Sequence, residues 1–216
     1  MNKTYITSKE MDIIAESVLT KAGVSTVWQG VVNKVDIDAL IEFEYGLEIV
    51  WEDIDYLAPC ESVFAAIVPK RKVIYMNETK KSLFKDKMGT MNFSKAHELG
   101  HWILHVTEQK DYLQLTFEEC ETFFCRSASK KSSQEIQADM FAASILMPRN
   151  IISSAINKLK QRGQVTFPDL YQLQGEFEVS ISAFTNRVKN LKLLYITDDK
   201  KIFLNEAEAT GQLSLL

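Results

Sequence analysis

The chain has 216 residues, which is enough for one substantial hydrophobic core or for one domain with a small appendage. Hydrophobic residues make up 46% and charged residues 25%, as in an ordinary soluble globular protein. The net charge of −4 argues against a generally basic nucleic-acid-binding protein. No apolar run approaches the roughly 20 residues of a membrane span, and the first ten residues lack the hydrophobic core of a signal peptide. We therefore expect a cytoplasmic protein.

The three cysteines, Cys60, Cys120 and Cys125, fit that compartment. An odd, small number does not form a disulfide framework. Cys120 and Cys125 could form a redox pair or part of a second metal site, but neither has a nearby histidine in the sequence. Free thiols are the favoured state in a reducing cytosol.

The first part of the chain predicts two helices. Residues 8–22 are amphipathic, with Ser8 as the expected N-cap and Gly23 as the stop. Its buried stripe is expected to consist of Ile13, Ile14, Val18 and Leu19. A second helix is expected at residues 36–45, closed by Gly46.

Three apolar, β-branched runs then predict strands at residues 47–51, 63–68 and 73–76. The basic residues 70–72 suit a solvated hairpin tip between the last two runs. The charged residues 79–87 suit a helix or a turn. Helices around a small antiparallel or mixed sheet indicate an α+β fold.

The motif His-Glu-x-x-His follows, with His97, Glu98 and His101 at its fixed positions. Residues four apart on a helix share one face, so the two imidazoles can bind one Zn²⁺. Glu98 projects beside the metal, where the general base for a zinc-bound water has to be. The alternative is an amphipathic core helix with two satisfied histidines.

Two features near the motif favour the metal site. The three histidines of the chain are all in this stretch, at residues 97, 101 and 105. Gly100 interrupts the helix at a cost of about 1 kcal/mol relative to alanine, which suits the close approach of another backbone. His105 continues the same face, but it lies about 12 Å along the axis from His97. It suits a packing or capping role better than a ligand role.

The third ligand is expected on a helix within residues 133–148. Glu135 and Asp139 are four apart, so Glu135 can bind the metal while Asp139 accepts the free ring N–H of a zinc histidine. The alternatives are a solvated carboxylate for Glu135 and a surface charge for Asp139. The apolar positions that predict the helix are Ile136, Met140, Ala143, Ile145 and Leu146, and the small residues that allow close packing are Ala138, Ala142 and Ala143. Ser132 is placed to cap this helix in a capping box, a role that competes with metal binding by Glu135.

Residues 91–105 together with residues 135–148 resemble the ImmA/IrrE family of zinc peptidases, and the resemblance spans residues 35–195. It implies a zincin-like fold and a gluzincin-like site, with the ligands His97, His101 and Glu135 and the catalytic base Glu98. It also implies that the substrate is a DNA-binding repressor, cut at a specific peptide bond. The chain differs from compact members in the long segment between Leu104 and Glu135.

That long segment contains two short β-like runs, Tyr112–Phe117 and Thr122–Arg126. They suit either a mobile flap over the cleft or an ordinary hairpin. The residue that stabilises the oxyanion is not identifiable from the sequence; Tyr112 and His105 are candidates.

Beyond Pro148 the pattern predicts three helices, at residues 149–160, 167–177 and 180–191, and a hairpin at residues 194–204. This order resembles a winged helix-turn-helix. The resulting division is residues 1–148 as the zinc metallopeptidase domain and residues 149–216 as a helical region packed on it.

The last of these helices carries a small basic strip, Arg187, Lys189 and Lys192, and an Asn186 that could read adenine. Direct DNA binding is therefore open, but packing on the peptidase core is favoured because the protein is acidic and phosphate contacts dominate DNA affinity.

The sequence thus predicts a cytoplasmic zinc-dependent endopeptidase with Glu98 as its base, and the family resemblance implies a role in transcription regulation with a helix-turn-helix repressor as the protein substrate. The alternatives are a DNA-binding regulator with non-catalytic zinc and a partner that only binds a repressor. Three protein ligands with one open position mark a catalytic zinc, whereas a structural zinc is closed by four. No cysteine lies within the motif, so the open site is favoured.

Overall fold

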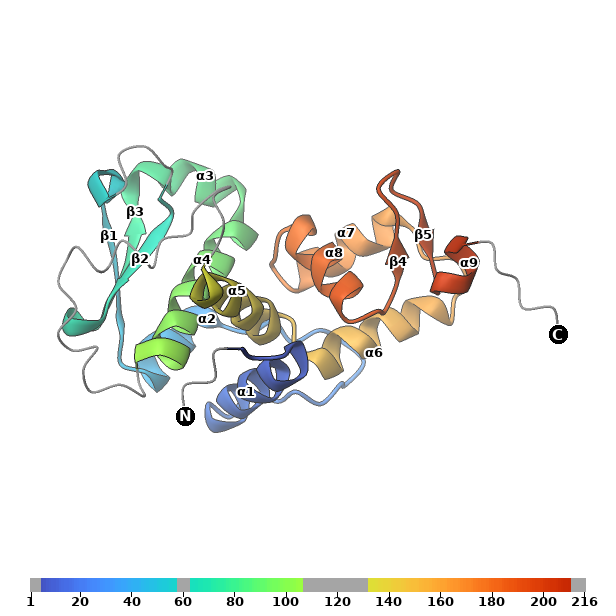
Figure 1. Cartoon of the computed structure of the whole chain (residues 1–216), viewed down its shortest axis with the longest axis horizontal. Helices are drawn as coiled ribbons and strands as arrows, with labels where there is room; N and C mark the ends of the chain where they lie inside the picture. The colour runs from blue at the N-terminus through green and yellow to red at the C-terminus, as the bar shows by residue number, and fades with distance from the viewer. Residues whose placement is uncertain (1–4, 58–62, 107–131, 211–216) are drawn as a thin grey trace.

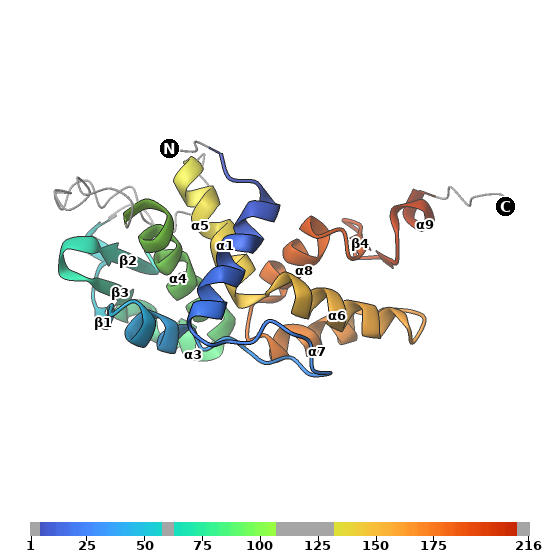
Figure 2. The ribbon, with the colours of Figure 1, turned by 90° about the horizontal axis from the view of Figure 1, so that it is seen from below.

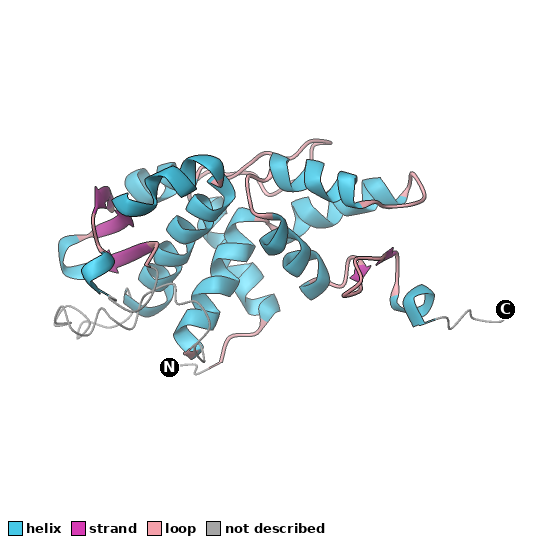
Figure 3. Ribbon diagram, turned by 90° about the horizontal axis from the view of Figure 1, so that it is seen from above, coloured by secondary structure: helices cyan, strands magenta, loops and turns pink. Residues whose placement is uncertain are grey.

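The computed structural model describes residues 5–57, 63–106 and 132–210 (Figure 1). Several predictions fall outside these residues: the two β-like runs between residues 112 and 126, the candidate Tyr112, and the three cysteines. The described part is α+β, as predicted, with a small sheet at one end and helices through the rest of the molecule (Figure 3).

The sheet has three strands, β1 (Glu48–Glu52), β2 (Ala65–Val68) and β3 (Val73–Asn77). Their order is β1-β3-β2, with β1 parallel and β2 antiparallel to β3, so the predicted mixed sheet is confirmed. The predicted hairpin tip is a short 3₁₀ turn, Pro69–Arg71, followed by Lys72 with a φ of 55°. Because of this order, β2 is an edge strand of the sheet.

The first helix, α1 (Ser8–Lys21), begins at residue 8, as in the predicted range, and ends one residue before residue 22. Thr7 is its N-cap and forms a reciprocal capping box with Glu10, so the prediction of Ser8 as the cap is wrong. The predicted stripe is also partly wrong, because Ile13 is 59% exposed. The buried face consists of Met11, Asp12, Ala15, Val18 and Leu19. This face includes a carboxylate, so hydrophobic residues alone could not locate it.

The second predicted helix is present as α2 (Ile37–Ala39), capped by Asp36 and continued by a π-helical turn, η1 (Leu40–Glu44). It ends at Gly46, whose φ of 61° is a left-handed conformation that glycine adopts without strain. A 3₁₀ turn, η2 (Asp55–Leu57), follows β1. After β3, a 3₁₀ turn η4 (Glu78–Lys80) leads into the short helix α3 (Lys81–Asp86).

The helix that carries His-Glu-x-x-His is α4 (Met88–His101), continued by a π-helical turn, η5 (Trp102–Val106). It packs against α5 (Ser133–Leu146), with α1 on the other side of α5 (Figure 2). A side chain at Gly100 would lie 3.3 Å from the backbone of Ala138, which confirms the close approach expected from this glycine. The backbones of α4 and α5 therefore meet beside the motif.

The C-terminal part follows the predicted order of helices and hairpin. Its helices are α6 (Arg149–Lys160), α7 (Phe167–Glu176), α8 (Ile181–Asn190) and α9 (Glu206–Thr210), and its hairpin strands are β4 (Tyr195–Ile196) and β5 (Ile202–Phe203). Buried side chains of α8 such as Phe184 and Val188 belong to the same apolar cluster as Leu19 of α1 and Ile145 of α5. The helix-turn-helix-like pair is thus packed on the rest of the protein.

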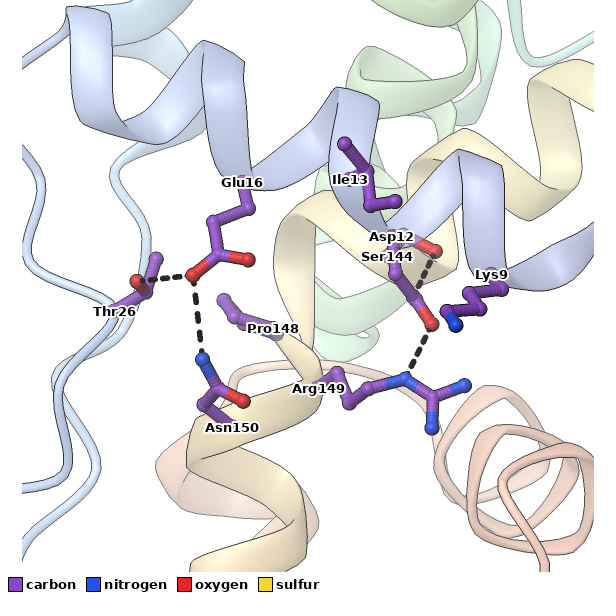
Figure 4. Close-up of a pocket in the computed structure, with 9 residues that line it drawn as sticks. All are labelled: Lys9, Asp12, Ile13, Glu16, Thr26, Ser144, Pro148, Arg149 and Asn150. Atoms are coloured by element: carbon purple, nitrogen blue, oxygen red, sulfur yellow. Dashed lines mark hydrogen bonds and ion pairs between the residues drawn. The ribbon is translucent and has the colours of Figure 1, made fainter.

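Arg187 on α8 also connects this region to the rest of the protein, through a buried ion pair. It is 3% exposed, and its guanidinium donates to the carboxylate of Asp12 on α1 and to the carbonyl of Met147 at the end of α5. Asp12 also accepts from Ser144 and Arg149, which line one edge of a pocket between α1, α5 and α6 (Figure 4). The prediction that Arg187 forms an exposed basic strip with Lys189 and Lys192 is therefore wrong for Arg187.

A second contact ties the turn between α7 and α8 to the start of α4. A side chain at Gly89 would lie 2.2 Å from the backbone carbon of Val179, so only glycine fits there without movement. Asn92 donates to the carbonyl of Glu178 at 3.1 Å, and Lys34 pairs with the Glu178 carboxylate. The helix that carries the motif is therefore held at its N-terminal end by the C-terminal region.

Candidate metal centre

Three predicted ligand side chains converge where α4 meets α5. The Nε2 atoms of His97 and His101 lie 3.0 Å apart. The two carboxylate oxygens of Glu135 lie 3.2 Å from these nitrogens, Oε2 from His97 and Oε1 from His101. Both histidines are fully buried and Glu135 is nearly so. One nitrogen or oxygen from each residue can therefore reach a common point, as the site residues of a metal ion must.

These separations fit a tetrahedral zinc. With zinc–nitrogen and zinc–oxygen distances of about 2.1 Å, neighbouring ligand atoms of a tetrahedron lie about 3.4 Å apart. The observed distances of 3.0 and 3.2 Å are close to that edge. The donor set of two imidazoles and one carboxylate is also the set found in zinc peptidases with one open position. The residues present therefore fit the metal that the sequence predicts.

Asp139, one turn further along α5, occupies the position predicted for it. Its Oδ1 lies 3.0 Å from Nδ1 of His97. If that nitrogen carries the proton and donates it to the carboxylate, Nε2 keeps the lone pair that a metal needs. The spacing of Glu135 and Asp139 on one helical face therefore places one carboxylate at the common point and the other behind the ring of His97.

The cap of α5 leaves Glu135 available. Ser132 accepts a hydrogen bond from the backbone N–H of Glu135 at 3.2 Å, so the predicted cap is present. The Glu135 carboxylate lies against the two histidines. Only the backbone N–H of Glu135 takes part in the cap, so the cap does not compete with the carboxylate of Glu135 for a metal ion.

The ionisation states favour metal binding. Burial raises the pKa of Glu135, but hydrogen bonds from His101 and His97 outweigh it and lower the pKa to about 2. Burial lowers the pKa of His101 to about 4, against the opposing influence of Glu135. An ionised carboxylate and a neutral imidazole are the forms in which these groups bind metals.

Glu98 lies beside the ligands on α4 and is fully buried. Neither of its carboxylate oxygens has a hydrogen-bond partner within the described residues. Burial raises its pKa to about 8; the charge of His97 lowers the pKa, and that of Glu135 raises it further. The backbone of Ile67 on β2 also acts on the carboxylate and lowers its pKa. A cation at the neighbouring ligands would favour the ionised carboxylate.

His105 lies next to His101, on the helical face predicted from its spacing. Its ring centroid is 5.5 Å from that of His101, and burial lowers its pKa. Four residues make nearly one turn both in an α-helix and in a π-helical turn, so η5 keeps His105 on the face of His101. The signal in the sequence for this position was the spacing of the three histidines, which lie four residues apart at 97, 101 and 105.

In the part of the chain that the structure describes, no helix is both long and apolar enough to span a membrane. Several comparisons with known proteins bear on the site. No curated protein matches the sequence. Among solved structures, a Mycobacterium tuberculosis transcriptional regulator is similar, with a TM-score of 0.53 and 16% identity. The match covers 92% of this chain and 54% of the regulator, so the chain spans about half of that protein's length. At this identity the likeness shows a shared fold.

A protein-family model, described as the IrrE N-terminal-like domain of the M78 peptidases, matches residues 60–189. The match begins just before the edge strand β2 and includes α4, α5 and most of α8. The resemblance seen in the sequence is thereby confirmed. Because the match extends over more than half of the 216 residues, the chain belongs to the family of IrrE N-terminal-like domains, peptidase M78.

Proposed function

We propose that this protein is a zinc-dependent endopeptidase that cleaves a DNA-binding transcriptional repressor. The observation that carries the proposal is the convergence of His97, His101 and Glu135, with Glu98 beside them on the same helix. His97, His101 and Glu135 are the proposed zinc ligands, and Asp139 orients His97 through its ring N–H.

Bound zinc supplies Lewis-acid polarisation of the scissile carbonyl and lowers the pKa of water at the site. Glu98 takes the proton from the attacking water and later returns it to the leaving amine. Its burial suits both steps, because a carboxyl group with a pKa near neutrality exchanges protons readily at pH 7. Glu135 is a poor candidate for this role, since the histidines lower its pKa to about 2 and make it a weak base.

The edge strand β2 is the proposed holder of the substrate. It pairs with β3 along one side only, so its other edge can accept an extended peptide by backbone pairing. The effect of the Ile67 backbone on the pKa of Glu98 supports the proposal that this strand lies beside the base. A peptide paired with β2 would therefore pass over the metal ligands.

The chain is proposed to act in the cytoplasm, with residues 1–148 as the peptidase domain and residues 149–216 as a region that packs on it. The repressor assignment rests on the family resemblance. The solved neighbour is itself named a transcriptional regulator, and this keeps one alternative open: a DNA-binding or repressor-binding regulator with non-catalytic zinc. The complete burial of Glu98 also favours this alternative, because a substrate has to reach that carboxylate.

One assay separates the two functions. The zinc-loaded protein is incubated with purified helix-turn-helix repressors of the same organism, and fragments are identified by mass spectrometry. A peptidase yields one specific cleavage, whereas a regulator leaves the repressor intact while binding it.

Two variants serve as controls. His97→Ala removes one ligand and should abolish stoichiometric zinc in the purified protein. Glu98→Gln keeps the shape of the side chain and removes the base, so it should bind zinc normally and lose cleavage by several orders of magnitude. Cleavage by Glu98→Gln at the parental rate would exclude the proposed mechanism.

A further inference from the structure

The two helices that carry the proposed zinc ligands, α4 and α5, are antiparallel. On α4, His97 lies 3.0 Å from Asp139 of α5. Four residues later on α4, His101 lies 3.2 Å from Glu135, which is four residues earlier on α5. The start of α4 and the end of α5 therefore lie at one end of the helix pair, and the proposed ligands lie toward the other end.

The start of α4 is held by the turn between α7 and α8. The side-chain amide of Asn92 donates to the carbonyl of Glu178 at 3.1 Å. The backbone of Val179 lies so close to Gly89 that a side chain on this glycine would come within 2.2 Å of it. Gly89 is about 12 Å along the helix axis from His97, at 1.5 Å per residue.

The end of α5 is held by α8, the helix that follows this turn. Nε and Nη2 of Arg187 each donate to the carbonyl of Met147, the C-cap residue of α5, at 3.2 Å. A carbonyl at a helix end lacks an intrahelical partner, and in a buried position it needs a donor from another element. The same guanidinium pairs with Asp12 of α1, which fixes its position. Met147 is about 18 Å along the helix from Glu135.

One short segment, residues 178–187, therefore connects the far ends of both ligand helices. Near the ligands the two helices meet at Gly100 and Ala138, where a side chain on the glycine would lie 3.3 Å from the facing backbone. Closely packed helices move relative to one another as rigid bodies. A change in the spacing of the far ends would therefore alter the angle at which the ligand ends meet.

We infer that Asn92 and Arg187 are positioning residues of the metal site. By holding the start of α4 and the end of α5 on one segment of the C-terminal region, they set the angle at which Glu135 meets His97 and His101. The inference rests on the proposed zinc site, and it couples the affinity for zinc to the packing of α7 and α8.

Asn92→Leu and Arg187→Met test the inference, since each removes the donor and keeps a side chain of similar length. Zinc dissociation constants are measured by competition with a chromogenic chelator, at a temperature at which circular dichroism shows each variant to be folded. Each variant should bind zinc about 2–30-fold more weakly, the range in which residues that touch neither of two sites alter the coupling between them. Asn92→Leu still decides the question if Arg187→Met fails to fold.

Thr7→Ala is the matched control. It removes the capping box of α1 and so lowers the stability of the fold, but at a helix that carries none of the proposed ligands. Its zinc affinity should equal that of the parent protein. A loss of affinity confined to Asn92→Leu and Arg187→Met would separate positioning from general stability.

Coupling between two sites is reciprocal, which gives a second measurement. If α8 holds α5 in place for zinc, bound zinc should also hold α8 in place. Hydrogen exchange of the backbone amides of α8 should therefore slow when the parent protein is loaded with zinc, and it should slow less in Asn92→Leu. The amides of α9 serve as the internal reference.

Three outcomes would overturn the inference: parental zinc affinity in Asn92→Leu, an equal loss of affinity in Thr7→Ala, or exchange of the α8 amides that does not depend on zinc. Each would show that the C-terminal region only covers the core. Failure of the unsubstituted protein to bind zinc would instead overturn the metal site itself.

Discussion

Arg187 and Asp12 are 175 residues apart in the sequence and form a buried ion pair between two helices. The pair connects α8 of the helix-turn-helix-like region to α1 at the other end of the chain. Both side chains are at least nine-tenths buried, so each charge is stabilised mainly by the opposite charge and little by water. The C-terminal region is therefore anchored by charge as well as by its apolar face.

Arg187→Met should destabilise the protein by about 3–5 kcal/mol, because it leaves a buried carboxylate without its main partner. Arg149, which also pairs with Asp12, should keep the loss from exceeding that range. The measurement is urea unfolding at pH 7. The matched control is Lys189→Met on the same helix, which is exposed and should change the free energy of unfolding by less than about 0.5 kcal/mol. Similar losses in both variants would show that the ion pair is not the cause.

The same pair predicts a pH dependence. Burial raises the pKa of Asp12, but the charge of Arg187 and the hydrogen bonds from Arg187, Arg149 and Ser144 outweigh it and hold the pKa below its usual value. A carboxyl group with a lowered folded-state pKa stabilises the fold above its unfolded pKa of about 3.9. That stabilisation is lost as the pH falls through the folded-state pKa.

The expected outcome is that the parent protein and Asp12→Asn differ most in unfolding free energy at pH 6–7 and converge as the pH falls below about 4. Urea titrations across this range provide the measurement. A difference that stays constant down to pH 3 would show that folding does not lower the pKa of Asp12.

Asp139→Ala should lower zinc affinity by about 10–100-fold, because the ring of His97 loses the carboxylate that orients it. Glu42→Ala is the matched control, since Glu42 is an exposed carboxylate of the η1 turn. Chelator competition measures both. A zinc affinity unchanged in Asp139→Ala would remove Asp139 from the site, whatever the behaviour of the ligands.

Replacing each of three helical glycines by alanine should change the stability of the protein by different amounts. Gly175 on α7 has open space around it, so Gly175→Ala should stabilise the protein by up to about 1 kcal/mol through helix propensity. A side chain at Gly100 would lie 3.1 Å from Phe141, so the helical gain should be offset by small movements. At Gly89 the overlap with the Val179 backbone should destabilise by about 1–3 kcal/mol.

Thermal and urea unfolding of the three variants test this order. Gly100→Ala has a second readout, because its added methyl group pushes α5 away from α4 at the level of Ala138, three residues after Glu135. Zinc affinity should therefore fall in Gly100→Ala and stay at the parental value in Gly175→Ala. Equal stabilities of the Gly89 and Gly175 variants would contradict the packing of α4 on the α7–α8 turn.

The candidate site could be predicted from the sequence because its parts have fixed spacing on single helices. His97 and His101 are four apart, as are Glu135 and Asp139, and helical periodicity alone places each pair on one face. Gly100 also indicated the close approach of a second backbone. The strands were predicted for a similar reason, since short β-branched runs and a basic turn are local signals.

Contacts between distant residues could not be predicted in this way. The carboxylate of Asp12 looked like a polar interruption of α1, and its partner Arg187 looked like part of an exposed basic strip. Each residue is explained only by the other, and no local pattern records that pairing. His105, by contrast, lies on the face of His101 that its spacing predicted, because that prediction depended on a single helix.

The burial of Arg187 sharpens the last prediction, which concerns DNA. Of the predicted strip on α8 and its edge, only Lys189 and Lys192 are exposed, so this strip offers at most two phosphate contacts. Two contacts would give a slope of only about −1.8 in the logarithmic dependence of affinity on salt. We therefore expect the free protein to show no sequence-selective binding of duplex DNA at sub-micromolar concentration in gel-shift titrations at two salt concentrations. Changing Lys189 and Lys192 to alanine should weaken repressor cleavage if the exposed face of α8 meets an acidic patch on the substrate, and it should leave zinc affinity unchanged. Tight, salt-sensitive and sequence-selective binding that this double change abolishes would instead establish α8 as a DNA-reading helix and favour the regulator over the peptidase.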